Sequence, residues 1–370
     1  MKRTEKKDVF RNLHRKGLAL LLAGLMVFGA IGCGDSKEGS SQENAAETNE
    51  ETAAAETNTA EAEMVEETGK DSYLIGYSLN SMDSTMKTMA DYFEGVAKER
   101  GWEPVLQNAN GDVTTELNNM EALMNMGCDA VVIMGCDTEG SAASIEELGA
   151  AGIPVIIAGR AIAANEDSYY TYVAGDHREA GKVQGEYLNG LLEQDEALEL
   201  NIAFIYGQSG SSSVEQRYEG FEENCLKGEY ADRVNLVASQ YAEFDTQKAY
   251  DITSDMLTTY PEINCFVTQS DEQAAGIINA IKAKGETVED FIIVSIDCST
   301  TGQTYLKSGE LDATVLMAMR QLAVSSADYV EAALNGETVE KTNQVEGYYQ
   351  LVTPDTYVSV MEANGMTADE

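Results

Sequence analysis

The chain has 370 residues and a formal net charge of −40 at pH 7, with 64 Asp and Glu residues against 24 Lys and Arg residues. So acidic a surface argues against nucleic-acid binding, because contacts to phosphates need basic side chains. The five cysteines beyond Cys33 are odd in number and scattered, so we expect buried thiols rather than a disulfide framework. They are Cys128, Cys136, Cys225, Cys265 and Cys298.

The N-terminal segment carries a targeting signal. Residues 1–16 hold seven basic and two acidic side chains, and an apolar run follows up to Cys33. This order is typical of a secretory signal, and the run is shorter than the ~20 residues of a spanning helix. The stretch "AIGC" resembles the bacterial lipoprotein signal, in which the cysteine is acylated. We therefore expect a signal peptide over 1–32, lipidation of Cys33, and a lipid anchor on the extracytoplasmic face of the bacterial cell membrane.

The segment after Cys33 is almost purely polar. Residues 34–70 hold eleven acidic residues and two lysines, with Met64 and Val65 as the sizeable apolar groups. Such a composition cannot bury enough apolar surface to offset the entropy of ordering. We expect a disordered acidic tether over 33–70.

From Tyr73 onward, short apolar runs alternate with amphipathic ones. The expected strands are residues 73–79, 104–108, 130–134, 154–159 and 172–175, then 201–207, 234–240, 264–269, 291–297 and 313–317. Helical periodicity lies between them, for example over 86–98, 115–126, 142–149, 179–192 and 247–259. Continuous Val- and Ile-rich strands alternating with helices predict parallel sheets covered on both faces. Two successive series predict an α/β fold with two doubly wound parallel-sheet lobes.

Signatures of catalysis are missing from the sequence. His177 is the one histidine outside the N-terminal segment, "GQSGSSS" lacks the spacing of a nucleophile elbow, and "GDHREAGKV" lacks that of a phosphate loop. With so many acidic residues, pairs of carboxylates arise by chance. We expect no enzyme activity, no catalytic residue, no metal and no cofactor.

Several motifs, in order and at the right spacing, resemble the ribose/galactose-type (type I) solute-binding proteins of sugar ABC importers. The likeness extends from about Tyr73 to Val360. Among its markers are "NGDVTTELNNMEALMNMGCDAVVI" (110–133), "AGIPVIIAGR" (151–160), "VAGDHREAGKVQGEYL" (173–188) and "IVSIDCSTTGQTYLKSGELDATV" (293–315). Repressors that share this fold carry a DNA-binding motif in front, where this chain has the lipoprotein signal.

The resemblance implies two lobes joined by a three-crossing hinge, which closes on a ligand. The N-terminal lobe would comprise 71–174 plus 318–345, and the C-terminal lobe 175–317 plus 346–370. The crossings would fall near residues 174–176, 317–319 and 344–347. The membrane permease would bind the surface that the two lobes form when they close.

The resemblance also implies pocket residues in the loop that follows the first strand. Asn80, Asp83, Ser84 and Met86 stand where the family has hydroxyl-binding groups and a stacking aromatic residue. Met86 in place of the aromatic residue is a departure from the family pattern.

Further pocket residues are implied along the rest of the chain. Arg160 matches a pocket arginine, Phe244 an aromatic residue that packs on the sugar, and Asp297 an aspartate that accepts hydrogen bonds from hydroxyls. Glu215 stands where ribose binders have a second arginine. Each has a structural alternative: an ion pair for Arg160, core packing for Phe244, a helix cap for Asp297 and an exposed helix face for Glu215. The remaining positions are Ser270 and Met317.

The expected function is that of a lipid-anchored, monomeric binding protein that delivers a small hydrophilic ligand to an ABC transporter permease. A monosaccharide is the favoured ligand, with a sugar alcohol or an amino-bearing ligand as alternatives. A second hypothesis is a sensory receptor that presents a sugar or signal molecule to a chemoreceptor or kinase. An extracytoplasmic hydrolase is a third, and the missing catalytic groups weigh against it.

Overall fold

The computed structural model describes residues 72–366, which form two six-stranded α/β sheets. The signal peptide, Cys33 and the tether lie outside the described residues. The first sheet has the strand order β11-β5-β4-β3-β1-β2 and is parallel throughout. Its strands are β1 (Leu74–Leu79), β2 (Glu103–Asn108), β3 (Ala130–Ile133), β4 (Val155–Ala158), β5 (Thr171–Ala174) and β11 (Thr342–Gln344).

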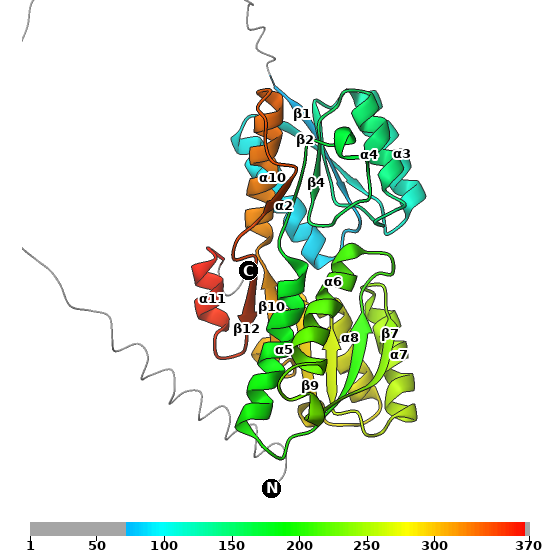
Figure 1. The fold of residues 1–370 in the computed structure, drawn as a ribbon, viewed down its shortest axis with the longest axis vertical. Helices are drawn as coiled ribbons and strands as arrows, with labels where there is room; N and C mark the ends of the chain where they lie inside the picture. The colour runs from blue at the N-terminus through cyan, green and yellow to red at the C-terminus, as the bar shows by residue number, and fades with distance from the viewer. Residues whose placement is uncertain (1–71, 367–370) are drawn as a thin grey trace, which may run out of the picture. The chain divides into compact units, whose positions relative to one another are not determined.

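Four helices cover this first sheet. α2 and α10 pack together on one face, and α3 and α4 pack together on the other (Figure 1). Their bounds are α2 (Ser84–Glu99), α3 (Val113–Met126), α4 (Ala142–Ala150) and α10 (Met319–Leu334). We call this sheet with its helices the first lobe.

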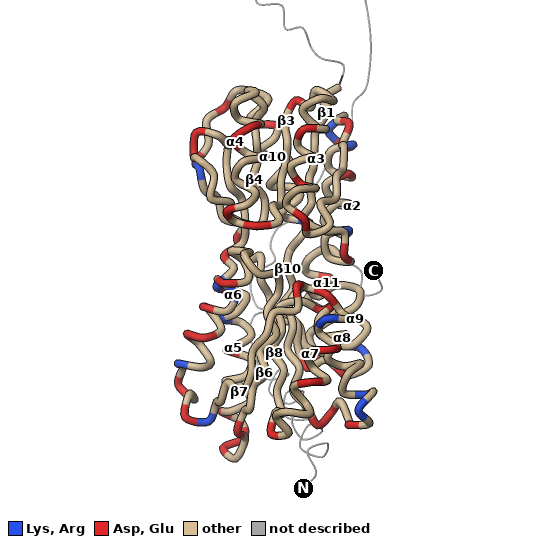
Figure 2. The backbone as a smooth tube through the Cα atoms, turned by 90° about the vertical axis from the view of Figure 1, so that its right-hand side faces the viewer, with Lys and Arg blue, Asp and Glu red and all other residues tan. Residues whose placement is uncertain are grey.

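The second sheet has the order β12-β10-β9-β8-β6-β7, with β12 antiparallel to β10 and the other neighbours parallel. Its strands are β6 (Leu200–Tyr206), β7 (Val234–Tyr241), β8 (Cys265–Thr268), β9 (Ile292–Asp297), β10 (Ala313–Met317) and β12 (Tyr349–Val352). Its helices are α5 (His177–Gln194), α6 (Ser212–Phe221), α7 (Thr246–Thr259), α8 (Asp271–Ala283), α9 (Thr300–Ser308) and α11 (Tyr357–Ala363). We call this the second lobe; α5 and α6 cover one face of its sheet, and α7, α8 and α9 the other (Figure 2).

The predicted α/β class with two parallel-dominated sheets is confirmed. All four residues of β3, β4 and β8 are buried, as expected for Val- and Ile-rich strands covered on both faces. The five cysteines beyond Cys33 are buried as well. Two short strands, β11 and β12, were not expected, because their polar and mixed sequences show no apolar run.

The chain passes between the two sheets at three places in the described residues. β5 leads into α5, β10 leads into α10, and β11 leads into β12. Gly175, in the first of these connections, lies against the ring of Tyr348 in the third. A Cβ atom at Gly175 would stand 2.1 Å from Tyr348 Cδ1, so a larger residue does not fit without displacing the ring.

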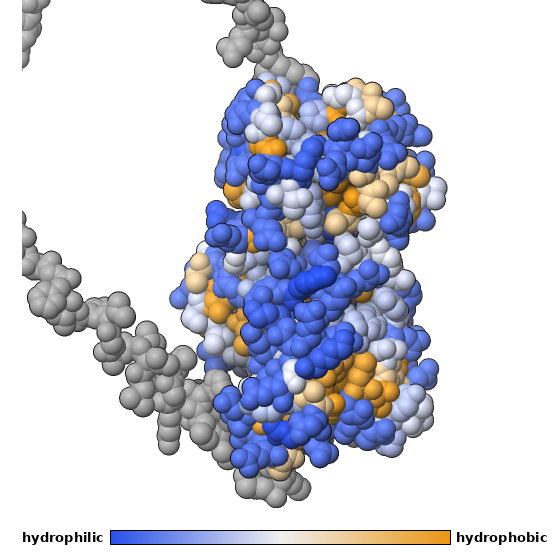
Figure 3. All heavy atoms as spheres, in the orientation of Figure 1, coloured by the Kyte–Doolittle hydropathy of each residue, from blue (hydrophilic) through white to orange (hydrophobic). Residues whose placement is uncertain are grey.

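Acidic residues are spread over helices and loops of both lobes, with fewer basic ones between them (Figure 2). The face seen in Figure 3 is largely hydrophilic, with smaller apolar areas. Across residues 72–366, no helix is both long enough and apolar enough to cross a membrane.

Candidate functional site

A cavity lies where the carboxyl ends of the parallel strands of both sheets meet. In open α/β sheets this edge is the usual ligand site, because loops and helix N-termini converge there. The centres of water molecules can occupy about 40 Å³ of the cavity. Its walls are formed by Asp83, Thr85, Met86, Met134, Gly159, Arg160, His177, Ser213, Arg217, Phe244, Ser270, Glu272, Asp297, Met317, Met319 and Tyr348.

Asp83 is the N-cap of α2. Its Oδ1 accepts hydrogen bonds from the backbone N–H groups of Thr85 and Met86 at 3.0 and 2.9 Å, which satisfies two of the free donors at the helix start. The cap turns the first residues of α2 toward the cavity, so that Thr85 and Met86 are buried in its wall.

Arg160 follows β4 and spans the two lobes. Its Nη1 donates to Gln208 Oε1 of the second lobe at 3.0 Å. Its guanidinium carbon lies 5.4 Å from the ring centre of Phe244, within cation–π range. Burial lowers the pKa of Arg160 to about 10, and the positive charge of Arg217 acts in the same direction. Arg160 still carries its charge at neutral pH.

Arg217, on α6, is the second cation of the cavity. Its Nη1 donates to the Gln269 carbonyl oxygen at 2.9 Å, and its Nη2 lies 3.2 Å from Met317 Sδ. Its Nε is buried and has no hydrogen-bond partner in the described structure. A buried donor without a partner costs free energy unless a ligand satisfies it. The geometry therefore leaves Arg217 ready to donate into the cavity.

Glu215 does not line the cavity, contrary to the expectation from sequence. It is exposed on α6, while Ser213 and Arg217 on the same helix are buried. Residues four apart lie on one face of a helix, and residues two apart point in widely different directions. The α6 residue whose charged side chain lines the cavity is therefore Arg217, two positions beyond the predicted residue. The structural alternative for Glu215, an exposed helix face, is the one found.

Asp297 ends β9 in an unusual backbone conformation. Its φ is 122° and that of Cys298 is 55°, values that non-glycine residues rarely adopt. Burial raises the pKa of Asp297 well above its ordinary value, and the neighbouring Asp271 carboxylate adds to the rise, while Arg217 opposes it. No helix begins at Asp297; Ser299 caps α9 instead.

Asp271, the first residue of α8, holds the turn around Asp297 in place. One of its oxygens accepts hydrogen bonds from the Ser295 hydroxyl and from Thr314 Oγ1, the latter at 2.8 Å. The other oxygen accepts from the backbone N–H of Ser299 at 2.7 Å. These bonds connect β9, β10 and the start of α9, and they hold the backbone on both sides of Asp297 and Cys298 in position.

Phe244 has a similar backbone feature at the end of β7. Glu243 and Phe244 have φ values of 54° and 57°. The phenyl ring packs directly on Gly207, where an added Cβ would stand 2.2 Å from two ring atoms. A glycine at 207 therefore makes room for the ring at the cavity wall.

His177 lies in the first connection between the lobes and is buried. Its Nε2 contacts the carbonyl oxygen of Gly159, and its Nδ1 contacts the Tyr349 hydroxyl. Because a carbonyl can only accept, Nε2 carries the proton and Nδ1 accepts from tyrosine. Burial lowers the pKa of His177 to about 3, with Arg217 acting in the same direction. The ring is neutral at physiological pH.

The two lobes contact each other directly around the cavity. Ser84 Oγ donates to Glu272 Oε1 across the gap at 2.5 Å. Ser212, at the start of α6, accepts a hydrogen bond from the Ala161 backbone N–H at 3.1 Å, and its own N–H donates to Thr138 Oγ1 at 3.1 Å. These bonds join the start of α2 to α8, and the loops after β3 and β4 to the start of α6.

The predicted pocket residues divide into two sets. The cavity wall includes seven of them: Asp83, Met86, Arg160, Phe244, Ser270, Asp297 and Met317. Asn80 is buried below the wall, and Ser84 acts through its bond to Glu272. Sequence reasoning missed Arg217 and Glu272. The four-residue spacing from Ser213 could have identified Arg217, whereas no local pattern marks Glu272.

The five charged side chains of the cavity are not ion-paired with one another. They are Asp83, Arg160, Arg217, Glu272 and Asp297. Among the residues that the structure describes, the salt bridges within 4.0 Å are formed by other side chains. Charged groups that converge without neutralising each other can serve as donors and acceptors for a polar ligand.

Two known binding proteins have similar sequences. The ribose import binding protein of Salmonella typhimurium is 26% identical over 259 residues, covering 70% of this chain and 83% of that protein. The xylitol-binding protein of Mycolicibacterium smegmatis is 24% identical over 276 residues, covering 74% of this chain and 76% of that protein.

Solved structures show the same fold. An ABC transporter solute binding protein from Bacillus halodurans with bound myo-inositol has a TM-score of 0.71 and 28% identity, covering 80% of this chain and 100% of that chain. The family described as "Periplasmic binding protein domain" matches residues 75–338. This chain therefore belongs to the periplasmic binding protein family, and its resemblance to the ribose/galactose-type members is confirmed.

Proposed function

We propose that this protein is an extracytoplasmic solute-binding lipoprotein of an ABC importer. It captures a small neutral polyhydroxylated ligand, a monosaccharide or a cyclic polyol, and delivers it to the permease. The observation that carries the proposal is the cavity in which three carboxylates and two guanidinium groups converge without ion pairs among them.

The chemistry of the wall suits such a ligand. Asp83, Glu272 and Asp297 can accept hydrogen bonds from hydroxyl groups, while Arg160 and Arg217 can donate to ring and hydroxyl oxygens. Apolar C–H faces of a sugar ring would pack on the Phe244 ring and on the thioether side chains nearby. With His177 neutral, three carboxyl groups face two guanidinium groups, so the wall has no excess of cations to neutralise an anionic ligand such as a sugar acid or sugar phosphate.

The relatives support the same class of ligand. The proteins named above bind or import ribose, xylitol and myo-inositol according to their descriptions, and all three compounds are small, neutral and rich in hydroxyl groups. Ribose itself is less favoured for this chain, because Met86 and Met317 stand where ribose binders have an aromatic residue and a polar one.

A lipid anchor is part of the proposal and rests on the sequence alone. The basic leader, the apolar run and "AIGC" place the acylated residue at Cys33, followed by the acidic tether. Metabolic labelling with a radioactive fatty acid tests this directly. Wild-type protein should be labelled and a Cys33→Ala variant should not; label retained in the variant would contradict the anchor.

Thermal unfolding in the presence of candidate ligands tests the binding function. A ligand at about 100 times its dissociation constant should add about 2.7 kcal/mol to the free energy of unfolding, which raises the midpoint clearly. The panel contains monosaccharides, cyclitols, sugar alcohols and amino sugars. If none of these, and no glycoside of them, raises the midpoint, even after unfolding and refolding to remove trapped ligand, the proposed function is wrong.

A sensory role remains the second candidate. The fructose binding periplasmic domain of a hybrid two component system shares the fold, with a TM-score of 0.71 at 24% identity. Uptake of the identified ligand by cells that lack this protein separates the two functions. Loss of uptake supports transport, and normal uptake with a lost transcriptional response supports sensing.

A further inference from the structure

A second, larger pocket adjoins the charged cavity. Water centres can occupy about 420 Å³ of it, against about 40 Å³ in the cavity. It lies between α2 and α10 of the first lobe and α9 and α11 of the second, and we call it the side pocket. Four residues line both spaces and form the junction between them: Thr85, Asp297, Met317 and Met319.

The volumes indicate that the cavity is only part of the ligand site. Small-molecule pockets usually measure about 300–1,000 Å³. The cavity alone falls well below this range, whereas the side pocket falls within it. The side pocket therefore offers the room for a second ligand unit that the cavity does not offer.

The side pocket differs from the cavity in its chemistry. Its wall is largely neutral and includes Thr88, Thr300, Gln321 and Asn364; the Thr88 hydroxyl donates to the Ser84 carbonyl oxygen, and the Asn364 amide bonds to Gln350 and Val360. Its two charged residues beyond the junction, Arg320 and Glu362, carry opposite charges and are exposed. Such a wall suits a neutral group with hydroxyls, since each hydroxyl can both donate and accept a hydrogen bond.

A link between two units of a ligand would have to pass the four residues that the two spaces share. The Thr85 hydroxyl is buried there and lies against the Asp297 carboxyl group. The Asp297 carboxylate borders both spaces, and its two oxygens can accept donors from either side. The Met317 and Met319 side chains have flexible thioethers that adapt to the shape of a ligand.

We propose that the ligand is a two-part neutral molecule. A polyhydroxylated ring occupies the charged cavity, and a second hydroxylated unit linked to it enters the side pocket, as in a disaccharide or a glycosylated polyol. This inference rests on the proposed function and narrows its substrate class from free sugars and cyclitols to their glycosides.

Calorimetric titration of the full protein tests the inference. The probes are ribose, galactose and myo-inositol, each compared with a disaccharide and a glycerol glycoside that contain the same ring. We expect a two-part ligand to bind at least about tenfold more tightly than its isolated ring, which is about 1.4 kcal/mol. Tighter binding of the disaccharide would identify the second unit as a sugar, and tighter binding of the glycerol glycoside would identify it as glycerol.

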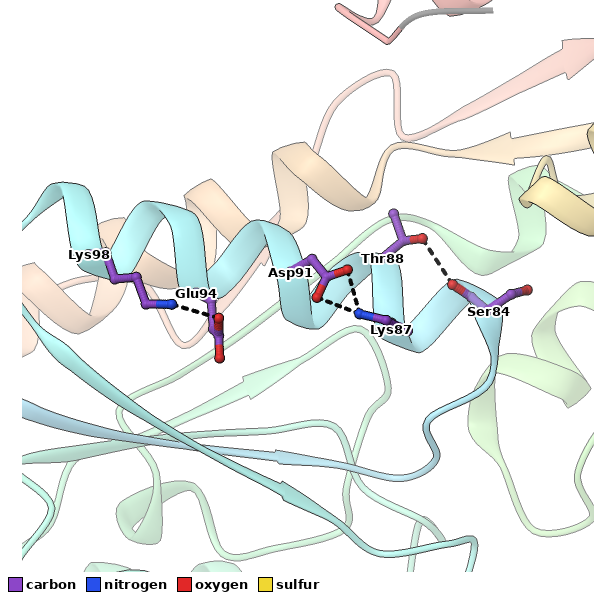
Figure 4. Close-up of polar contacts among 6 residues, drawn as sticks. All are labelled: Ser84, Lys87, Thr88, Asp91, Glu94 and Lys98. Carbon is purple, nitrogen blue, oxygen red and sulfur yellow. Dashed lines mark hydrogen bonds and ion pairs between the residues drawn. The ribbon is translucent and has the colours of Figure 1, made fainter. Parts of the chain in front are cut away.

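A pair of neighbouring substitutions on α2 locates the second unit. Thr88 lines the side pocket, whereas Lys87 pairs with Asp91 at the exposed surface, and the two side chains project from different sides of the helix (Figure 4). Thr88→Trp should fill the pocket and weaken the two-part ligand at least about tenfold, while the isolated ring changes less than about twofold. Lys87→Trp should change neither.

A second variant that blocks the side pocket, together with the wild-type titrations, separates failure of this inference from failure of the proposed function. Gln321→Trp narrows the side pocket from α10 and replaces Thr88→Trp if that variant does not fold. Isolated rings that bind as tightly as the two-part ligands, or blocking variants that bind two-part ligands normally, would overturn the inference while leaving the proposed function intact. If the wild type binds neither kind of ligand, both proposals fail.

Discussion

Replacing Arg217 with methionine removes the second cation of the cavity while keeping most of the side chain's apolar volume. In the structure, Nη1 donates to a carbonyl oxygen, Nη2 lies 3.2 Å from a sulfur atom, Nε has no hydrogen-bond partner, and the guanidinium group also faces the Tyr349 hydroxyl. Nε and Nη2 therefore remain for ligand oxygens. A hydrogen bond to a charged group contributes about 1.5–3 kcal/mol, and two bonds from one group are not fully additive. We expect Arg217→Met to weaken ligand binding by about 2–4 kcal/mol, roughly 30- to 1,000-fold in Kd.

The matched control is Glu215→Gln on the same helix. Glu215 is exposed and lies outside the cavity wall, so its Kd should stay within about twofold of wild type, as for most surface substitutions. Isothermal titration calorimetry with the ligand from the thermal screen measures both variants, and urea unfolding checks that each is folded. If Arg217→Met binds the ligand normally, Arg217 does not contact it. If Glu215→Gln loses binding instead, Glu215 is the α6 residue that contacts the ligand.

The remaining predictions concern the hinge, the aromatic wall and the contact between lobes. Because the pKa of His177 is lowered to about 3, its neutral form stabilises the fold above pH 6.5, and this contribution is lost as the pH falls toward 3. Urea unfolding should show wild type losing about 1.4 kcal/mol per pH unit below pH 6.5 relative to His177→Gln, and parallel pH profiles would contradict the neutral assignment. Gly207→Ala should weaken ligand binding because its Cβ displaces the Phe244 ring, whereas Gly190→Ala, with no atom within 4 Å of the new Cβ, should stabilise its helix by about 0.5–1 kcal/mol. Equal binding by these two alanine variants would rule out the packing argument. Ser212→Ala removes the side-chain hydrogen bond to the loop after β4, so ligand release in stopped-flow measurements should be about 2- to 10-fold faster; an unchanged rate would show that this contact does not hold the lobes together.

Two residues of the charged cavity have strained backbones. Phe244 lies just beyond β7 and Asp297 ends β9, and both have positive φ values. The surrounding packing and hydrogen bonds stabilise a conformation that costs about 1–3 kcal/mol by itself. Strain at these two positions is thus consistent with a binding role.

The local sequence determined the fold class and most of the elements. Continuous apolar strands such as β3 and β4 are recognisable because burial on both faces of a parallel sheet favours apolar residues, mostly Val and Ile, at every position. The motifs also placed Arg160, Phe244 and Asp297 at strand ends, where the fold converges, and the structure brings all three into one wall.

Only the tertiary structure decided which of several polar residues reach the cavity. Glu215 and Arg217 stand two positions apart in one helix, and the packing of α6 determines which of them is buried. Glu272 became part of the site because α8 faces Ser84 from the other lobe, a contact between residues far apart in the chain. The side pocket is likewise invisible in the sequence, since its walls come from helices of both lobes. Periodicity reports what is buried within one element, whereas a site between lobes depends on how the elements are placed together.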